Sequence, residues 1–315
     1  MLTSTKMKKN SLSSSLADAI SVLPSPLQPI SHPLLDKHRV QLWCKRDDLL
    51  HPTISGNKWR KLKYHLQHAT KQGKQHLLSF GGAYSNHIHA LAAAGCQCSL
   101  RTTGIIRGEP NSADNPTLTD ARRWGMTLKF VDRASYRLRQ NADWLSQFAT
   151  ADTLIIPEGG SSSLALPGVR ELIDEVPFSP DIWVLPCASG GTLAGMIAGK
   201  RERERILAIA VLKGAHFIAN EVCRLYPAAS TTQGWHIAQA HHDGGYAKFS
   251  PALWQWVQDF SASTGIPLEP IYSGKAMWGL FRELEAGQIP AGSKLIFIHT
   301  GGLQGLAGLQ HQGRI

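Results

Sequence analysis

The sequence lacks long apolar runs and is poor in cysteine. No apolar run approaches the roughly 20 residues that a transmembrane helix requires, which argues against a membrane partner. Only five cysteines occur in 315 residues, and this odd number argues against a disulfide framework and for a reducing compartment. We therefore expect a cytoplasmic protein, long enough for two domains around a large buried core.

Acidic residues are also scarce, because 23 Asp and Glu face 33 Lys and Arg and leave a net charge of +10. Such an excess would suit a nucleic-acid partner if it were organised. The basic residues are scattered, however, and no RNP, zinc-finger or helix-turn-helix signature gathers them. We predict a small anionic ligand and no nucleic acid.

Metal-ligand spacing is absent as well. Cys96 and Cys98 form a C-x-C pair without a second cluster, and they are expected as strand residues on opposite sides of a pleat. His241 and His242 lack a third spaced ligand and are expected in a loop. The sequence therefore predicts no metal site.

The first 23 residues contain lysines followed by serines, which faintly resembles a targeting peptide. The segment is too polar for a secretory signal, and we expect a tail followed by a short helix. From the Pro-rich "LPSPLQPI" onward, short apolar runs alternate with glycine turns and helical patterns. This alternation predicts an α/β fold of mostly parallel strands covered by helices on both faces.

Two later segments carry separate expectations. Residues Trp235 to Tyr246 show no clear periodicity and are expected to form a loop. The segment "PALWQWVQDFSASTG" is an amphipathic pattern with Ser250 before its proline and Gly265 at its end. It predicts a helix that is capped at both ends.

The stretch "ISGNKWRKLKYHL" places Lys58 behind a Gly-Asn turn and at the start of a helix. Trp59, Leu62 and Leu66 share one face, which we expect to be buried, while the basic face is expected to be solvated. The helix N-terminus and the neighbouring cations should lower the pKa of Lys58. An easily deprotonated lysine is a nucleophile, although the stretch taken alone is better explained as a plain solvated basic face, and the rest of the chain must decide.

The loop "CASGGTLAGM" follows an apolar run and opens a helix. The backbone amides of Ser189, Gly190, Gly191 and Thr192 can converge on one anion at that helix N-terminus, which predicts a phosphate site. Neither the Walker pattern nor G-x-G-x-x-G is present. The glycines could also serve only a tight turn.

Other strand ends carry uncharged polar groups. Ser85, Asn86 and His87 follow "SFGGAY", where a serine or asparagine could simply cap a helix. Thr300 follows the apolar run "LIFI". A hydroxyl at that position can donate to a ring nitrogen or close the turn.

A further pair, Tyr272 and Ser273, lies in "EPIYSGKAMWGL", where the tyrosine could be core or could reach into a cleft. A reactive lysine, a phosphate loop without nucleotide signatures and polar groups at strand ends together suit pyridoxal 5'-phosphate. This cofactor needs a lysine for its Schiff base, an anchor for its phosphate and partners for its ring.

Five motifs in this order, "KRDDLLHPTISGNKWRKLKY", "GGAYSNH", "SGGTLAG", "PIYSGKAMWGL" and "IHTGGLQGL", resemble the D-cysteine desulfhydrase and 1-aminocyclopropane-1-carboxylate deaminase family. The resemblance begins near Leu27 and covers most of the chain, with Ser55 where the family usually has glycine. It implies fold type II, with pyridoxal phosphate in the cleft between two domains of twisted, mostly parallel sheets flanked by helices. It also implies a large domain of residues 1–60 and 158–315, a small domain of residues 61–157, and a homodimer.

The resemblance assigns roles residue by residue. Lys58 matches the Schiff-base lysine, Ser85 and Tyr272 match catalytic groups, and Asn86 matches the partner of the ring oxygen. Residues 85–87 and Tyr272 match the substrate-binding positions. The cofactor-binding matches are Lys58, Asn86, Ser189, Gly190, Gly191, Thr192, Ser273 and Thr300.

Two positions separate the branches of the family. The deaminases carry glutamate after the motif tyrosine and glutamine after Ser-Asn, where this sequence has Ser273 and His87. A hydroxyl near the ring nitrogen makes a weaker electron sink than a carboxylate, which suits elimination of a good leaving group. The expected activity is conversion of D-cysteine to pyruvate, sulfide and ammonia. The alternatives are the cyclopropane deaminase, another fold-type II deaminase, and a cofactor-binding protein without turnover.

Overall fold

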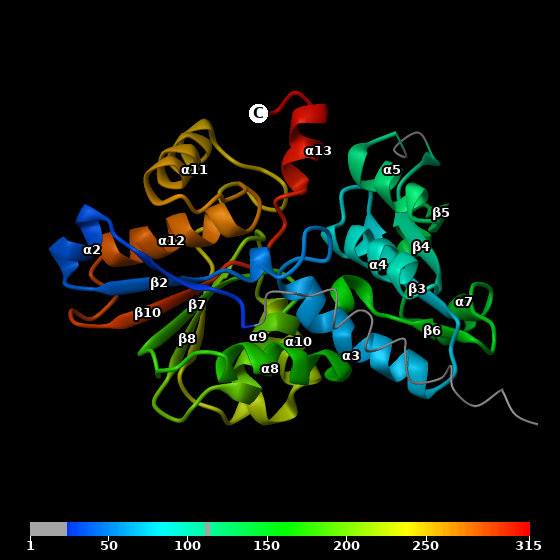
Figure 1. The fold of residues 1–315 in the computed structure, drawn as a ribbon, viewed down its shortest axis with the longest axis horizontal. Coiled ribbons are helices and arrows are strands. Elements are labelled where there is room, and N and C mark those ends of the chain that lie inside the picture. The colour runs from blue at the N-terminus through cyan, green and yellow to red at the C-terminus, as the bar shows by residue number, and fades with distance from the viewer. Residues whose placement is uncertain (1–23, 111–113) are drawn as a thin grey trace, which may run out of the picture.

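Two sheets of unequal size organise the chain (Figure 1). The computed structural model describes residues 24–110 and 114–315. The predicted tail and short helix at the N-terminus lie outside the described residues. The strands are β1 (Leu27–Ile30), β2 (Gln41–Lys45), β3 (His76–Gly82), β4 (Arg101–Arg107), β5 (Thr127–Val131), β6 (Thr153–Ile155), β7 (Ile182–Cys187), β8 (Arg205–Ala210), β9 (Trp235–Ala238) and β10 (Lys294–Ile298).

The larger sheet has the order β1-β2-β10-β7-β8-β9 and the smaller sheet the order β5-β4-β3-β6. Every neighbouring pair is parallel except β1 with β2. The predicted α/β fold of mostly parallel sheets is confirmed. The helices are α2 (Pro33–His38), α3 (Asn57–Lys71), α4 (Asn86–Gln97), α5 (Pro116–Arg123), α6 (Arg133–Arg137), α7 (Ala142–Ser146), α8 (Leu166–Asp174), α9 (Gly191–Gly199), α10 (Phe217–Leu225), α11 (Pro251–Thr264), α12 (Ser273–Glu285) and α13 (Gly305–His311), with short 3-10 turns at Asp47–Leu49, Glu158–Gly160, Ser163–Ala165 and Pro227–Ser230.

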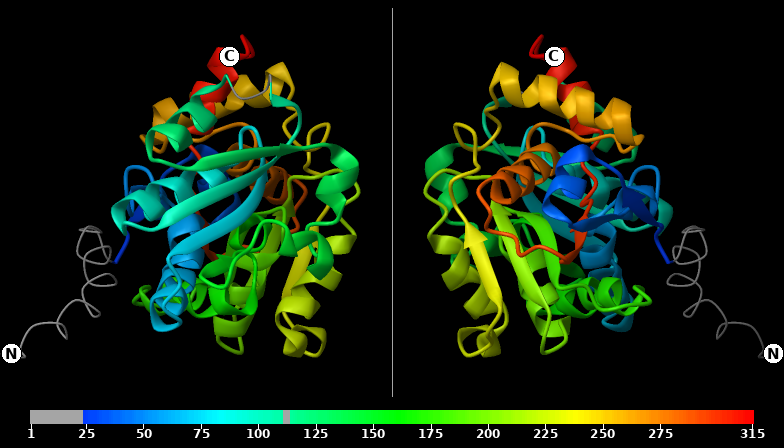
Figure 2. Two further views of the ribbon diagram at one scale, coloured as in Figure 1. Left: turned by 90° about the vertical axis from the view of Figure 1, so that its right-hand side faces the viewer. Right: turned by 90° about the vertical axis from the view of Figure 1, so that its left-hand side faces the viewer.

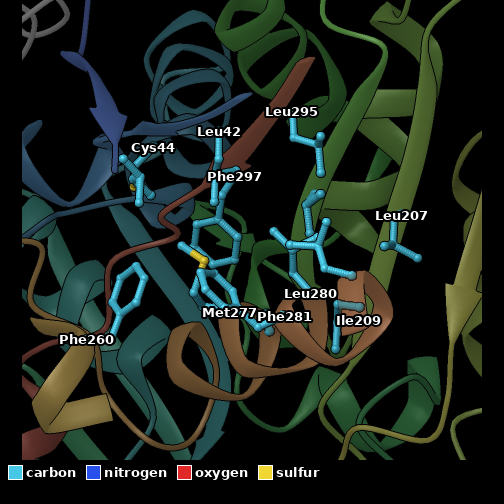
Figure 3. Close-up of a cluster of buried hydrophobic side chains, with 14 of the residues drawn as sticks. Leu42, Cys44, Leu207, Ile209, Phe260, Met277, Leu280, Phe281, Leu295 and Phe297 are labelled. Carbon is cyan, nitrogen blue, oxygen red and sulfur yellow. The ribbon is translucent and has the colours of Figure 1, made fainter. Parts of the chain in front are cut away.

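Helices cover both faces of the larger sheet. On β10, Leu295 and Phe297 pack in the core beneath α2, α11 and α12, while Ile296 and Ile298 pack in the core with α8, α9 and α10. Figure 3 shows the first of these cores, where Phe297 lies among side chains of α12. Because alternate residues on both faces are buried, each central strand reads as a continuous apolar run.

The smaller sheet faces the viewer in the left view of Figure 2. Apolar side chains on one face of this sheet pack with α3, α4 and α5, and those on the other face pack with residues of α6 and α7. It is built from residues between β3 and β6, inside the segment predicted as the small domain. The predicted boundary after residue 60 falls within α3, which lies between the two halves in Figure 1.

Two local predictions were wrong. Trp235–Ala238 is strand β9, which pairs with β8 at the edge of the larger sheet, although the segment was expected to be a loop. Its side chains are mostly half-buried or exposed, so the edge strand lacks a clear apolar alternation. Cys96 and Cys98 lie at the end of helix α4 rather than in a strand, because the alanine-rich segment continues the helix to Gln97.

The capped helix after Ser250 is confirmed as α11. The Ser250 hydroxyl accepts the Leu253 amide at 3.2 Å, and Gly265 ends the helix with φ of 67°. Among the residues that the structure describes, no helix is long and apolar enough to cross a membrane.

Candidate active site

A close backbone contact sets the position of the Lys58 turn. Gly56 has φ of 64° and ψ of −147°, and its amide donates to Asp47 O at 2.8 Å. A Cβ at Gly56 would lie 2.0 Å from Thr300 O. Only glycine fits there, so the end of β10 and the start of α3 come into direct contact.

Helix α3 is buried on more than one face, which corrects the expectation of a solvated basic face. Arg60 and Lys61 are each 1% exposed. Arg60 pairs with Asp47 at 2.9 Å and also with Glu175. Its charge is therefore neutralised by these two carboxylates.

Lys58 lies in the first turn of α3, where it is half-buried. Burial lowers its pKa from 10.5 to about 8. The direction of this shift confirms the prediction, but its cause is desolvation rather than the crowding of cations that the sequence suggested. Within the described residues Lys58 makes no ion pair, so its amine is available to react.

The glycine loop after β7 contacts α3. Asn57 Nδ2 donates to Thr192 Oγ1 at 3.0 Å, and Ser189 Oγ lies 2.9 Å from Ser161 Oγ. Gly190 adopts φ of 75°, which turns the chain into helix α9. The loop that was predicted to bind phosphate therefore lies beside the helix that carries Lys58.

Lys61 lies at the same loop. Its Nζ donates to Gly159 O at 3.3 Å and to Ser161 Oγ at 3.2 Å, and it would lie 3.0 Å from a Cβ at Gly191. Burial, followed by the charge of Lys58, holds the pKa of Lys61 well below its usual range. No carboxylate in the described chain forms an ion pair with it. A buried amine beside a loop of backbone amides fits a phosphate group, which would supply the missing negative charge.

The segment Ser85 to His87 begins α4. Ser85 caps the helix, and its hydroxyl accepts the Ile88 amide at 3.3 Å. Asn86 lies beside Gly302, where a Cβ would be 2.8 Å from Asn86 Nδ2. Asn86 thus lies next to the loop that follows Thr300.

His87 is buried, and its Nε2 lies 2.8 Å from Ser79 Oγ. Ser79 uses its own proton to bond Ile156 O at 2.8 Å, so His87 Nε2 must be the donor and Nδ1 must carry a lone pair. Nδ1 has no hydrogen-bond partner in the described structure. Burial, followed by the charges of Lys58 and Lys61, lowers the pKa of His87 well below 6.5, so this histidine is neutral.

Tyr272 precedes α12, and its hydroxyl lies 3.3 Å from that of Tyr246. Burial raises the pKa of Tyr272 well above 10, with a further contribution from Tyr246, so the phenol keeps its proton at neutral pH. The next residue, Ser273, is fully buried and its hydroxyl lies 3.0 Å from Glu269 Oε1. Thr300 is 7% exposed and its hydroxyl has no partner within the described residues.

The structure therefore brings the predicted residues to one region between the two sheets. Lys58, Thr300 and the glycine loop meet at the start of α3, and Asn86 approaches from the smaller sheet. Sequence reasoning missed Lys61, Ser161, Tyr246 and Glu269. The spacing of three residues from Lys58 to Lys61 was a usable signal, because it places both on one side of a helix. The other three contacts are tertiary and left no local pattern.

Comparisons with known proteins agree on one family. Residues 20–301 match the family model described as pyridoxal-phosphate dependent enzyme. A bifunctional D-cysteine desulfhydrase/1-aminocyclopropane-1-carboxylate deaminase of Arabidopsis thaliana is 30% identical, over 91% of this chain and 78% of its own length. A D-cysteine desulfhydrase of Yersinia pestis is 26% identical, over 90% of this chain and 92% of its own length.

Among solved structures, an ACC deaminase homologue superposes with a TM-score of 0.79 and 26% identity, covering 96% of this chain and 97% of its own. A fungal L-serine ammonia-lyase from Rhizomucor miehei has a TM-score of 0.64 at 14% identity, covering 89% of this chain and 94% of its own. This second likeness shows the fold alone.

Proposed function

Since this chain belongs to the pyridoxal-phosphate dependent enzymes, we propose that it is a lyase that removes a β-substituent and the amino group from a small amino acid. The residues at the site suit the cofactor. Among residues 24–110 and 114–315, no carboxylate pairs with Lys61 beside the amides of Ser189 to Thr192, and this combination suits a phosphate. The same helix presents Lys58 one turn earlier.

In this proposal residues from several elements would hold the cofactor. Lys58 would form the covalent link, while Lys61 and residues 189–192 would bind the phosphate. Asn86 would interact with the ring oxygen, and Thr300 and Ser273 would serve the ring nitrogen. The contact of Thr300 with Gly56 and of Asn86 with Gly302 supports a common location for these groups.

The remaining roles follow from charge and burial. Bound pyridoxal phosphate supplies an electron-withdrawing ring that stabilises negative charge at the substrate Cα. Lys58, with a pKa of about 8, can accept the Cα proton near neutral pH. The amides at the N-terminus of α4, around Ser85, Asn86 and His87, bind the substrate carboxylate. Tyr272 keeps its phenolic proton and donates it to a leaving group or to a product carbon.

The observation that carries the proposal is the half-buried amine of Lys58, which has a lowered pKa and no acidic partner in the described chain. Replacing Lys58 by alanine should abolish the visible absorbance of the covalently bound cofactor. A Lys58→Ala protein that keeps this absorbance would contradict the assignment.

Two substrate readings remain. D-cysteine is favoured because Ser273 stands where a deaminase would carry a carboxylate. Glu269 favours the second substrate, 1-aminocyclopropane-1-carboxylate. Its buried carboxylate lies 3.0 Å from the Ser273 hydroxyl, close to the position where a deaminase would carry its own carboxylate. Assays with D-cysteine, L-cysteine, β-chloroalanine and the cyclopropane amino acid, each scored for 2-oxo acid, separate these readings. Cofactor-loaded protein that releases no 2-oxo acid from any of them would instead indicate a binding protein.

A homodimer and a cytoplasmic location remain predictions. Light scattering on the purified protein would measure its mass in solution, and cell fractionation would locate it.

A further inference from the structure

Glu269 lies four residues before Ser273, and its carboxylate is buried. The proposed mechanism gives it no role. Glu269 is 2% exposed. Its Oε2 accepts the Ile271 amide at 2.7 Å, and its Oε1 accepts the amides of Tyr272 at 2.9 Å and Ser273 at 2.6 Å. In the described structure this carboxylate forms no ion pair, so its ligands are backbone amides and a hydroxyl.

These bonds determine where α12 begins. The first amides of a helix have no partner within the helix, and Tyr272 adopts the non-helical angles φ −122° and ψ −72°. Glu269 satisfies three successive amides, two of which belong to Tyr272 and Ser273. The carboxylate therefore fixes the backbone from which the Tyr272 phenol extends.

The hydroxyl of Ser273 belongs to the same arrangement. It accepts the Glu269 amide at 3.0 Å and lies 3.0 Å from Glu269 Oε1. An ionised carboxylate has no proton to give, so the hydroxyl must donate to it. The Ser273 proton is thus directed toward Glu269.

The other side of Glu269 faces the loop after β10. A Cβ at Gly302 would lie 3.9 Å from Glu269 Cγ and 2.8 Å from Asn86 Nδ2. Gly302 has φ of 94°, a conformation that favours glycine, and both side chains lie close to the position that its Cβ would occupy. Glu269 therefore lies where α12, the loop after β10 and the start of α4 meet.

We propose that Glu269 is a positioning residue for the reaction, whose ionised carboxylate holds Tyr272 and Ser273 in place and supports the Gly302 contact with Asn86. This inference rests on the proposed function, because Tyr272 and Asn86 act only if the site does. Glu269 itself touches neither substrate nor cofactor in this scheme.

The test compares Glu269→Gln with Glu269→Asp and with the control Glu204→Gln. Glutamine keeps the shape but replaces one accepting oxygen with an amide donor, whereas aspartate keeps the charge. Glu204 is an equally buried carboxylate, 1% exposed, which accepts the Arg201 amide at 2.9 Å and the Trp183 indole at 3.0 Å. Unlike Glu269, it also pairs with the Arg201 guanidinium at 3.1 Å, so its replacement is at least as disruptive. The control thus removes a similar polar contact made by residues outside the proposed site.

Hydrogen exchange of the cofactor-free protein, read on peptides that span residues 270–276, supplies a readout independent of activity. We expect faster exchange in Glu269→Gln, but not in Glu269→Asp or Glu204→Gln. We also expect kcat of Glu269→Gln to fall roughly 10- to 100-fold with KM little changed, as for a misplaced catalytic group, and Glu269→Asp to recover part of it.

Unchanged exchange in Glu269→Gln would overturn the inference, as would an equal loss of kcat in Glu204→Gln. If Glu269→Gln does not fold, kcat of Glu269→Asp decides, because a shorter carboxylate should place Tyr272 less well and lower kcat, and a wild-type kcat would overturn the inference. If the wild-type protein turns over none of the substrates, the proposed function fails, while the exchange data still decide whether Glu269 holds Tyr272 and Ser273.

Discussion

The Nζ atom of Lys61 lies 3.2 Å from Ser161 Oγ, and this buried amine has no carboxylate partner within the described residues. Three neighbouring buried cations differ. Lys45 pairs with Glu175, Arg46 pairs with Asp48 at 2.7 Å, and Arg60 pairs with Asp47 and Glu175. Lys275 is also fully buried without an ion pair in the described chain, but its amine donates to Gly245 O at 2.6 Å. Around α3 and β2 the buried cations are paired, whereas Lys61, beside the glycine loop, has only uncharged partners and is left for an anionic ligand.

Replacing Lys61 by methionine should weaken cofactor binding. A hydrogen bond to a charged group contributes about 1.5 to 3 kcal/mol, so the dissociation constant should rise about 10- to 100-fold. Equilibrium titration of the cofactor-free protein measures this. The free energy of unfolding without cofactor should stay the same or rise, because a buried amine without a carboxylate partner is replaced by an apolar side chain. Lys63→Met is the control, because Lys63 belongs to the same helix but pairs with Glu171 at 2.7 Å. Equal cofactor affinity in wild type, Lys61→Met and Lys63→Met would contradict the prediction.

Covalent capture of the cofactor should depend on the ionisation of Lys58. Because the unprotonated amine is the nucleophile, the rate should rise with pH, reach half its maximum near pH 8 and level off above. Stopped-flow absorbance after mixing cofactor with cofactor-free protein measures the rate. A midpoint near the ordinary lysine value of 10.5 would mean that burial does not lower the pKa.

Gly56→Ala should destabilise the protein strongly. The new Cβ would meet Thr300 O at 2.0 Å in a backbone conformation that other residues avoid, so we expect a loss of about 2 to 5 kcal/mol in the free energy of unfolding. Gly73→Ala is the matched control, because Gly73 has φ of 65° and no atom within 4 Å of a new Cβ. Its expected cost is only about 1 kcal/mol. Urea denaturation compares the two, and equal losses would show that the contact with Thr300 is not tight.

The titration of Glu269 should affect stability and turnover in opposite directions. Burial raises its pKa from 4.5 to about 7, despite the opposing hydrogen bonds. Between these values the folded protein holds a proton that the unfolded chain releases, so the contribution of Glu269 to stability is present below pH 4.5 and falls as the pH rises to about 7. Turnover should instead rise through pH 7 as the carboxylate ionises.

Thermal unfolding from pH 4.5 to 8 of wild type, Glu269→Gln and Glu204→Gln measures the stability slope. The slope should be reduced in Glu269→Gln alone. An identical slope in wild type and Glu269→Gln would rule out titration of Glu269 in this window.

Local patterns were sufficient for several features because they depend on neighbours in the chain. The continuous apolar runs predicted buried parallel strands, and the Ser250 and Gly265 caps marked α11. Lys58 and the loop from Ser189 to Thr192 were recognisable from residue type at the end of a strand or the start of a helix. Strand β9 was missed because an edge strand buries little and lacks a clear alternation.

The sequence by itself determined the α/β architecture, the position of Lys58 at a helix start and the glycine loop, since hydrophobic period, glycine turns and helix starts depend on adjacent residues. Only the tertiary structure decided which charges are neutralised. Arg60 and Lys61 are neighbours in one basic run, yet packing gives Arg60 two carboxylate partners and gives Lys61 none within the part of the chain that the structure describes. The physical reason is that burial and ion pairing depend on segments distant in sequence, such as Glu175 and Ser161, which meet α3 only when the sheets assemble.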